Sequence, residues 1–81
     1  MNDSTETVDS VRSRVASIFE QVLGRPVEPE SDLFDIGGDS ADAVEIIEMV
    51  RHWSGVDIDV LELLEAGVSV RSVANLVGAA L

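Results

Sequence analysis

The sequence contains neither cysteine nor lysine, and each absence excludes a class of site. Without cysteine there can be no disulfide framework and no thiolate metal site. Without lysine, the glycines of the chain cannot belong to a phosphate-binding loop of the nucleotide-hydrolysing type. Aromatic residues are scarce as well, because Phe19, Phe34 and Trp53 are the only ones. Aliphatic side chains must therefore form most of the core.

Long apolar runs are missing and basic residues are few. No stretch approaches the ~20 apolar residues of a membrane span, and residues 1–7 lack the positive start and apolar stretch of a secretory signal. Sixteen acidic residues against five arginines give a net charge of −11. Such a charge repels nucleic acid phosphates and anionic lipids. We expect a cytoplasmic, soluble protein that binds neither nucleic acid nor membrane and favours basic protein surfaces.

The length of 81 residues predicts one domain, residues 1–81, which is too small for a deep catalytic cavity. A first helix is expected from Val8 to Leu23, after a disordered or frayed segment at residues 1–7, and Gly24 is expected to end it. Its apolar positions lie three and four residues apart, as on one buried helix face. These positions are Val11, Val15, Ile18, Phe19, Val22 and Leu23.

A long loop over residues 24–39 follows, extended by Pro26 and Pro29. The side chains expected to hold it to the core are Val27, Leu33, Phe34 and Ile36. The second helix is predicted from Ser40 to about Trp53, with Asp39 as its N-cap. Its inward positions are expected to be Val44, Ile47 and Val50, flanked by Ile46 and Trp53.

Two further helices are predicted near the end of the chain. A short one runs from Val60 to Glu65 and ends by Gly67, and Ser69 is placed to cap the last helix. The apolar face of the last helix consists of Val70, Val73, Leu76, Val77 and Ala80. Three longer helices and one short helix predict an all-α four-helix bundle.

Ser40 is the most informative residue, because it stands where the loop with Gly37 and Gly38 becomes a helix. The glycines leave the approach to the hydroxyl unobstructed. A helix start also offers unpaired N–H groups and a positive dipole end, which would stabilise a phosphate ester. Serine is common as a simple helix cap, so the position alone leaves that alternative open. The combination with the double glycine, Phe34 and the long loop favours a modified serine.

A catalytic role for Ser40 is disfavoured. The only histidine, His52, lies twelve residues later on the same predicted helix, which places it roughly 18 Å away. That distance leaves the serine without a base, and no glycine stands two residues after it, as a nucleophile elbow requires. A serine of this kind is better suited to modification by another enzyme. A hydrolase is therefore less favoured than a modified carrier or an unmodified binding protein.

The chain resembles, over nearly its whole length, the phosphopantetheine-dependent carrier proteins of fatty acid, polyketide and nonribosomal peptide synthesis. These proteins have a first helix ending in Leu-Gly, then an acidic residue, a Phe, a glycine pair, and Asp-Ser or His-Ser opening the second helix. The matching residues here are Leu23, Gly24, Asp32, Phe34, Gly37, Gly38, Asp39 and Ser40.

The resemblance implies a non-catalytic carrier. Ser40 would receive 4′-phosphopantetheine from coenzyme A through a phosphopantetheinyl transferase, and Gly38 and Asp39 would adjoin the cofactor. The thiol of the arm would hold an acyl or aminoacyl group as a thioester and present it to partner enzymes. Those partners would be a loading enzyme, of adenylation or acyltransferase type, and the downstream enzymes of a polyketide or nonribosomal peptide synthase.

The details within the family point two ways. The double glycine and Phe34 look like modular peptidyl carriers, whereas Asp39-Ser40 and residues 42–48 look like freestanding acyl carriers. Family members usually have leucine after the serine, where this chain has Ala41, so partner preference is expected to differ. Met1 opens the chain and the pattern fills it almost to Leu81, which predicts a freestanding protein, and a monomer is expected. The double glycine and Ala41 favour natural-product assembly over primary fatty acid synthesis.

Acidic residues recur every third position from the end of the loop, at Asp39, Asp42, Glu45 and Glu48. A solvated helix face is one explanation of this acidic stripe. The overall acidity favours the other, a docking surface of Ala41, Asp42, Glu45 and Glu48 for basic partner enzymes. The rival hypothesis for the whole chain is an unmodified acidic helical adaptor that binds a basic protein surface. No metal is expected, since Glu48 and His52 lack a third ligand.

Overall fold

The computed structural model describes the backbone of residues 3–81 and the side chains of residues 10–81. Within that part of the chain the regular structure is entirely helical. The helices are α1 (Asp3–Leu23), α2 (Ser40–Ser54), α3 (Val60–Ala66) and α4 (Val70–Ala80). The predicted all-α architecture of three longer helices and one short helix is therefore confirmed.

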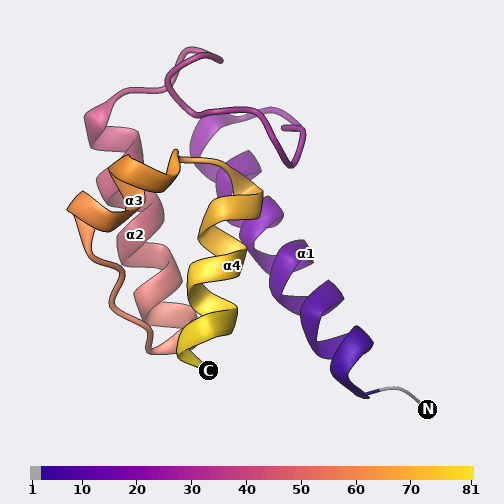
Figure 1. Cartoon of the computed structure of the whole chain (residues 1–81). Coiled ribbons are helices and arrows are strands. Elements are labelled where there is room, and N and C mark those ends of the chain that lie inside the picture. The colour runs from indigo at the N-terminus through magenta and orange to yellow at the C-terminus, as the bar shows by residue number, and fades with distance from the viewer. Residues whose placement is uncertain (1–2) are drawn as a thin grey trace.

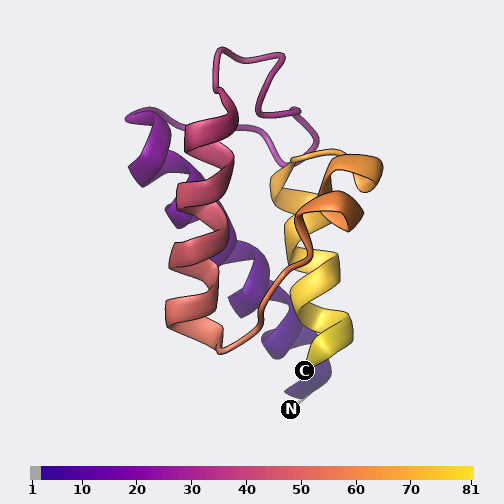
Figure 2. The same cartoon turned by 90° about the vertical axis from the view of Figure 1, so that its left-hand side faces the viewer.

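The helices form a small bundle in which α1 packs against both α2 and α4, while α3 contacts α4. Figures 1 and 2 show α1 running toward the long loop, and α2 and α4 running back from it. The loop over residues 24–39 covers one end of the bundle, and α2 begins at that end. The first turn of α1 and the last turn of α4 lie at the opposite end. None of the helices described is long and apolar enough to cross a membrane.

Local signals set most helix ends where the sequence predicted them. Gly24 has a left-handed φ of 76°, and its N–H donates to the carbonyl of Glu20 at 2.7 Å, which closes α1. The hydroxyl of Ser69 accepts a hydrogen bond from the Ser72 N–H at 3.1 Å and caps α4. Asp59 caps α3 in the same way through the N–H of Leu61 at 2.9 Å, a cap that the sequence analysis did not identify.

The helix α1 begins at Asp3, five residues before the predicted start. The expected disordered or frayed segment at residues 1–7 lies partly outside the described residues, because residues 1 and 2 are not described. From Asp3 onward the backbone is helical. The periodic apolar positions on which the predicted start depends begin only at Val8 and Val11, so the residues before them add nothing to an apolar pattern. Apolar periodicity alone therefore misses such a turn.

The core is aliphatic, with Phe19 as its single aromatic residue. Each helix contributes one face, and the loop contributes Leu33. The fully buried side chains are Val15, Phe19, Leu33, Ile46, Val50, Leu63, Val68, Val73 and Val77. Burying each aliphatic side chain of this size contributes about 1.5–3 kcal/mol. Most of these side chains lie on the buried faces of α1, α2 and α4, which therefore supply most of the stabilisation.

Asp32 fixes the long loop to the start of α4. Its carboxylate accepts hydrogen bonds from the backbone N–H groups of Phe34 at 2.9 Å and Val68 at 3.1 Å. The N–H of Leu33 donates to the carbonyl of Val68 at 2.7 Å, and that of Arg71 to Pro29 at 2.9 Å. Polar backbone groups that the loop brings toward the core are thus paired, which allows so long a loop to pack closely.

Three packing predictions are wrong. Leu33 is fully buried and anchors the loop, whereas Phe34, expected to do so, is 41% exposed. In α2 the buried face is Ala43, Ile46, Ile47 and Val50, so Val44 points outward with 53% of its surface exposed. Ala80 is exposed at the end of α4. In each case the choice between neighbouring apolar residues depends on how the elements meet, which local spacing does not specify.

Candidate functional site

Ser40 is the first residue of α2 and is exposed at the loop end of the bundle. The residue before it, Asp39, is the N-cap, as predicted. The N–H of Asp42 donates to the Asp39 carboxylate at 3.0 Å, and the N–H of Asp39 donates to the Asp42 carboxylate at 3.1 Å. This reciprocal capping box starts the helix without the Ser40 hydroxyl. Ser40 is therefore not the cap, and the explanation of this serine as a simple capping residue is wrong.

Backbone N–H groups remain available beside Ser40. The capping box uses the N–H of Asp42, and the N–H of Ala43 donates to the Asp39 carbonyl at 3.1 Å. In residues 3–81 no acceptor is found for the N–H groups of Ser40 and Ala41. These donors and the positive helix end can receive the oxygens of a phosphate ester on the Ser40 hydroxyl.

Gly38 has a packing role beneath the serine. A Cβ atom at this position would lie 2.5 Å from the side chain of Leu33 and 2.9 Å from its carbonyl oxygen. The N–H of Gly38 donates to that carbonyl at 2.8 Å. Gly37, with a left-handed φ of 96°, turns the chain just before. The double glycine therefore lets the loop fold tightly over Leu33 and brings Ser40 to the surface.

No histidine lies beside Ser40, and the two neighbouring carboxylates, those of Asp39 and Asp42, are engaged in the capping box. His52 is exposed near the other end of α2, and helix geometry separates the two by roughly 18 Å. No group of three histidine, aspartate or glutamate residues in the described part of the chain lies close enough together to hold a metal ion. A hydroxyl without a base cannot act as a nucleophile unless another protein supplies the base.

The acidic stripe starts at Ser40 and follows α2. Asp39, Glu45 and Glu48 are exposed, while Asp42 is half-buried and its carboxylate takes part in the capping box. Glu48 also approaches Arg51 at 3.9 Å, an exposed pair of the kind that contributes at most about 1 kcal/mol. Glu45 makes no ion pair among residues 10–81. The stripe thus keeps an uncompensated negative charge at Glu45, five residues after the serine.

Exposed apolar residues on α3 were missed by the sequence analysis. Leu61 and Leu64 both point away from the core, and only Leu63 of this helix is buried. A signal was present, because residues 60, 61, 63 and 64 are all apolar, more than one face of a seven-residue helix can bury. Exposed apolar residues that lie together mark contact surfaces more often than isolated ones do.

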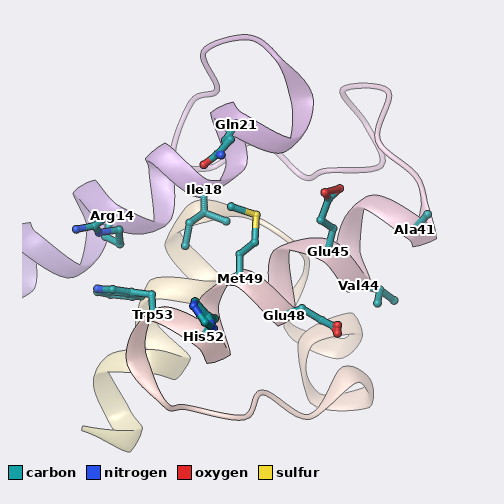
Figure 3. Close-up of a pocket in the computed structure, with 10 residues that line it drawn as sticks. All are labelled: Arg14, Ile18, Gln21, Ala41, Val44, Glu45, Glu48, Met49, His52 and Trp53. Atoms are coloured by element: carbon teal, nitrogen blue, oxygen red, sulfur yellow. The ribbon is translucent and has the colours of Figure 1, made fainter.

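A groove of about 560 Å³ runs between α1 and α2. It was not foreseen from the sequence. Figure 3 shows Ile18 of α1 and Met49 of α2 directed toward each other between the helices, with Arg14 next to Trp53 at one end and Ala41 at the other. The Arg14 guanidinium lies 5.8 Å from the centre of the Trp53 ring, within the range of a cation–π interaction. The remaining lining residues are Gln21, Val44, Glu45, Glu48 and His52.

The fold and the site together define a class of small helical proteins that present one serine at the start of the second helix. A comparison with protein families identifies the class, because residues 13–77 match the family described as the phosphopantetheine attachment site. The chain belongs to this family. It is a carrier protein with 4′-phosphopantetheine as its cofactor, which confirms the family and the cofactor predicted from the motif.

Solved structures of carrier proteins have the same fold. One is BlmI, a type II acyl carrier protein from Streptomyces verticillus involved in bleomycin biosynthesis. It is 25% identical to this chain with a TM-score of 0.86, and the match covers 96% of this chain and 94% of BlmI. A second match is a chain in the structure of the phosphopantetheine transferase Sfp in complex with coenzyme A and a peptidyl carrier protein. The two chains are 28% identical with a TM-score of 0.76, and the match covers 85% of this chain and 90% of the matched chain.

A third structure, of an active-site mutant of a peptidyl carrier protein in solution, is 28% identical with a TM-score of 0.78, over 88% of this chain and 79% of that one. The comparison with curated proteins gives no significant match. The likeness thus extends to both acyl and peptidyl carriers, the two types between which the sequence motifs were divided.

Proposed function

We propose that Ser40 is the residue that carries the phosphopantetheine arm. The observation that supports this most directly is the capping box: Asp39 and Asp42 start the helix by themselves, which leaves the Ser40 hydroxyl exposed and without a structural task. The N–H groups of Ser40 and Ala41 would then hold the phosphate oxygens. Gly38 and Asp39 would contribute by shaping the backbone on which the phosphate rests.

The attachment step uses chemistry that a partner brings. In the reaction the Ser40 oxygen bonds to the phosphorus of the pantetheine-linked phosphate, the pyrophosphate bond of coenzyme A breaks, and adenosine 3′,5′-bisphosphate leaves. The hydroxyl proton passes to a base on a phosphopantetheinyl transferase, since the carboxylates beside Ser40, those of Asp39 and Asp42, already accept the hydrogen bonds of the capping box. The Sfp complex supports a transferase as partner, because it shows a carrier protein bound to such an enzyme.

The same surface would guide partner enzymes. Ala41, Asp42, Glu45 and Glu48 line the exposed side of α2 from the attachment point, and the negative charge of this stripe would draw basic partner surfaces toward Ser40. Leu61 and Leu64 on α3 offer apolar area that a partner could cover. Charge would accelerate the encounter and apolar contact would prolong it.

The arm would hold an acyl or aminoacyl group as a thioester for polyketide or nonribosomal peptide assembly. This context is supported by the bleomycin carrier and the peptidyl carriers among the similar structures. A loading enzyme of adenylation or acyltransferase type would attach the cargo, and downstream synthase enzymes would receive it. We propose that the carrier acts in the cytoplasm as a monomer.

Intact-protein mass spectrometry tests the proposal against its rival. The purified protein is incubated with coenzyme A and a promiscuous phosphopantetheinyl transferase, alongside Ser40→Ala. We expect the native protein to gain the mass of one phosphopantetheine group and the variant to gain none. A native protein of unchanged mass, with undiminished binding of Ser40→Ala to a basic partner, would instead support the unmodified acidic adaptor.

A further inference from the structure

The groove between α1 and α2 begins beside the attachment point. Its α2 side is formed by residues three and four positions apart, which lie along one face of the helix. They are Ala41, Val44, Glu45, Glu48, Met49, His52 and Trp53. Ala41 directly follows Ser40, and Val44 lies one helical turn after Ser40 on the same side. The groove therefore extends from the residue next to the serine along nearly all of α2.

The length of this groove matches the length of the phosphopantetheine arm. From Ala41 to Trp53 the helix rises about 18 Å at 1.5 Å per residue. The arm has roughly 14 bonds between the serine oxygen and its sulfur, and at about 1.2 Å per bond, as in an extended polypeptide, it reaches about 17 Å. An arm laid in the groove would thus bring its thiol to the level of His52 and Trp53.

The lining also matches the chemistry of the arm, which alternates a dimethyl-substituted carbon and methylene groups with two amides. Ile18 and Met49 offer an apolar floor, and Val44 adds an exposed methyl surface near the start. Gln21, Glu45 and His52 place hydrogen-bonding groups along the rim (Figure 3). At the far end Trp53, 36% exposed, offers ring surface beside the Arg14 guanidinium.

We propose that this groove holds the carrier's own arm between encounters with partner enzymes, with the thiol end against Trp53. The proposal rests on attachment at Ser40. Tethering at the first residue of α2 gives the arm a high effective concentration at the groove, so weak contacts suffice. Beyond its phosphate the arm is uncharged and is not repelled by Glu45 and Glu48. A second copy of the chain, with its net charge of −11, would be repelled.

Two readouts test the proposal without any partner enzyme. Trp53 is the only tryptophan and there is no tyrosine, so intrinsic fluorescence reports on one end of the groove. The chain has no cysteine, so the arm carries the only thiol. In protein shown by intact mass to be fully loaded, we expect acrylamide to quench Trp53 less than in the unloaded protein. We expect the thiol to react with a disulfide reagent at least about threefold more slowly than free pantetheine, as a mostly bound arm requires.

A matched pair of variants locates the effect. Val44→Ser removes an apolar group that lines the groove, while Val60→Ser makes the same change at the start of α3, outside it. The two valines are 53% and 48% exposed, so both variants are expected to fold, which circular dichroism would verify. We expect Val44→Ser to raise the thiol reactivity toward that of pantetheine and Val60→Ser to leave it unchanged.

The outcomes separate this proposal from the assignment of Ser40. A full gain of mass with unchanged Trp53 quenching and a thiol as reactive as free pantetheine would overturn the groove proposal and leave the attachment intact. Equal effects of the two valine substitutions would also overturn it, because they would place the arm elsewhere. No gain of mass would overturn both.

Discussion

At the scale of single residues, the site depends on a division of tasks between neighbours. Asp39 and Asp42 start the helix through their reciprocal hydrogen bonds, which frees the hydroxyl of Ser40. Gly38 supplies the space in which Leu33 packs below them. Serine is a preferred N-cap residue, so the presence of a separate cap at Asp39 distinguishes Ser40 as a residue available for modification.

Gly38→Ala is expected to lower the free energy of unfolding by about 1–3 kcal/mol, because the added Cβ would overlap the Leu33 side chain and force the loop to shift. Urea denaturation followed by circular dichroism measures this change. The matched control is Gly78→Ala in α4, where a Cβ meets nothing within 4 Å; it is expected to stabilise by about 0.5–1 kcal/mol through helix propensity. Equal effects at the two glycines would show that the contact with Leu33 is not what requires Gly38.

At the scale of elements, the long loop behaves as part of the core rather than as a flexible connection. Leu33 is buried among the helices, and Asp32 pairs with the backbone of Phe34 and of Val68. The loop therefore fixes the start of α2, where Ser40 lies, relative to the start of α4. A transferase or partner that recognises this end of the bundle would meet a surface whose shape is set before binding.

Leu33→Ala is expected to destabilise the protein by about 2–5 kcal/mol, since it leaves a cavity among the helices. Phe34→Ala, one residue along the same loop, removes a side chain that is 41% exposed and lies outside the buried core, and it is expected to change stability by less than about 1 kcal/mol. Thermal or urea unfolding of the pair compares them directly. A larger loss of stability in Phe34→Ala than in Leu33→Ala would show that Phe34 anchors the loop, as the sequence predicted.

Local chemistry explains which features the sequence could predict. Gly24, Asp39 and Ser69 end or begin helices through hydrogen bonds to residues within four positions, so their roles are readable from the chain. The exposure of Val44 could not be predicted, because it depends on which face of α2 meets α1. The groove could not be predicted for the same reason, since Ile18 and Met49 come together only when α1 and α2 pack against each other.

At the scale of the whole molecule, the excess of negative charge serves contact with proteins better than stability. A net charge of −11 on 81 residues repels itself, yet the acidic stripe concentrates part of it along the helix that starts with Ser40. Partners with basic surfaces would be steered to the end of the molecule where Ser40 lies. This steering would weaken as salt screens the charges.

Glu45→Gln is expected to slow association with the transferase by about two- to fivefold at low ionic strength, because it removes a charge five residues from Ser40 on the same helix. Asp57→Asn removes the same charge from an exposed position after the end of α2, far from the serine, and is expected to have little effect. Stopped-flow binding at two salt concentrations compares them, and the difference is expected to vanish at high salt. Equal slowing by both variants would show that net charge matters and the stripe does not.

The most direct test of the account is to locate the phosphopantetheine group on the chain. The protein is loaded with coenzyme A and transferase and then digested, and the peptides that contain Ser31 and Ser40 are fragmented in the mass spectrometer. The account predicts that every fragment carrying the added mass includes Ser40 and that none requires Ser31. Modification at any other residue, or a chain that stays unmodified beside a carrier protein loaded in the same reaction, would contradict it.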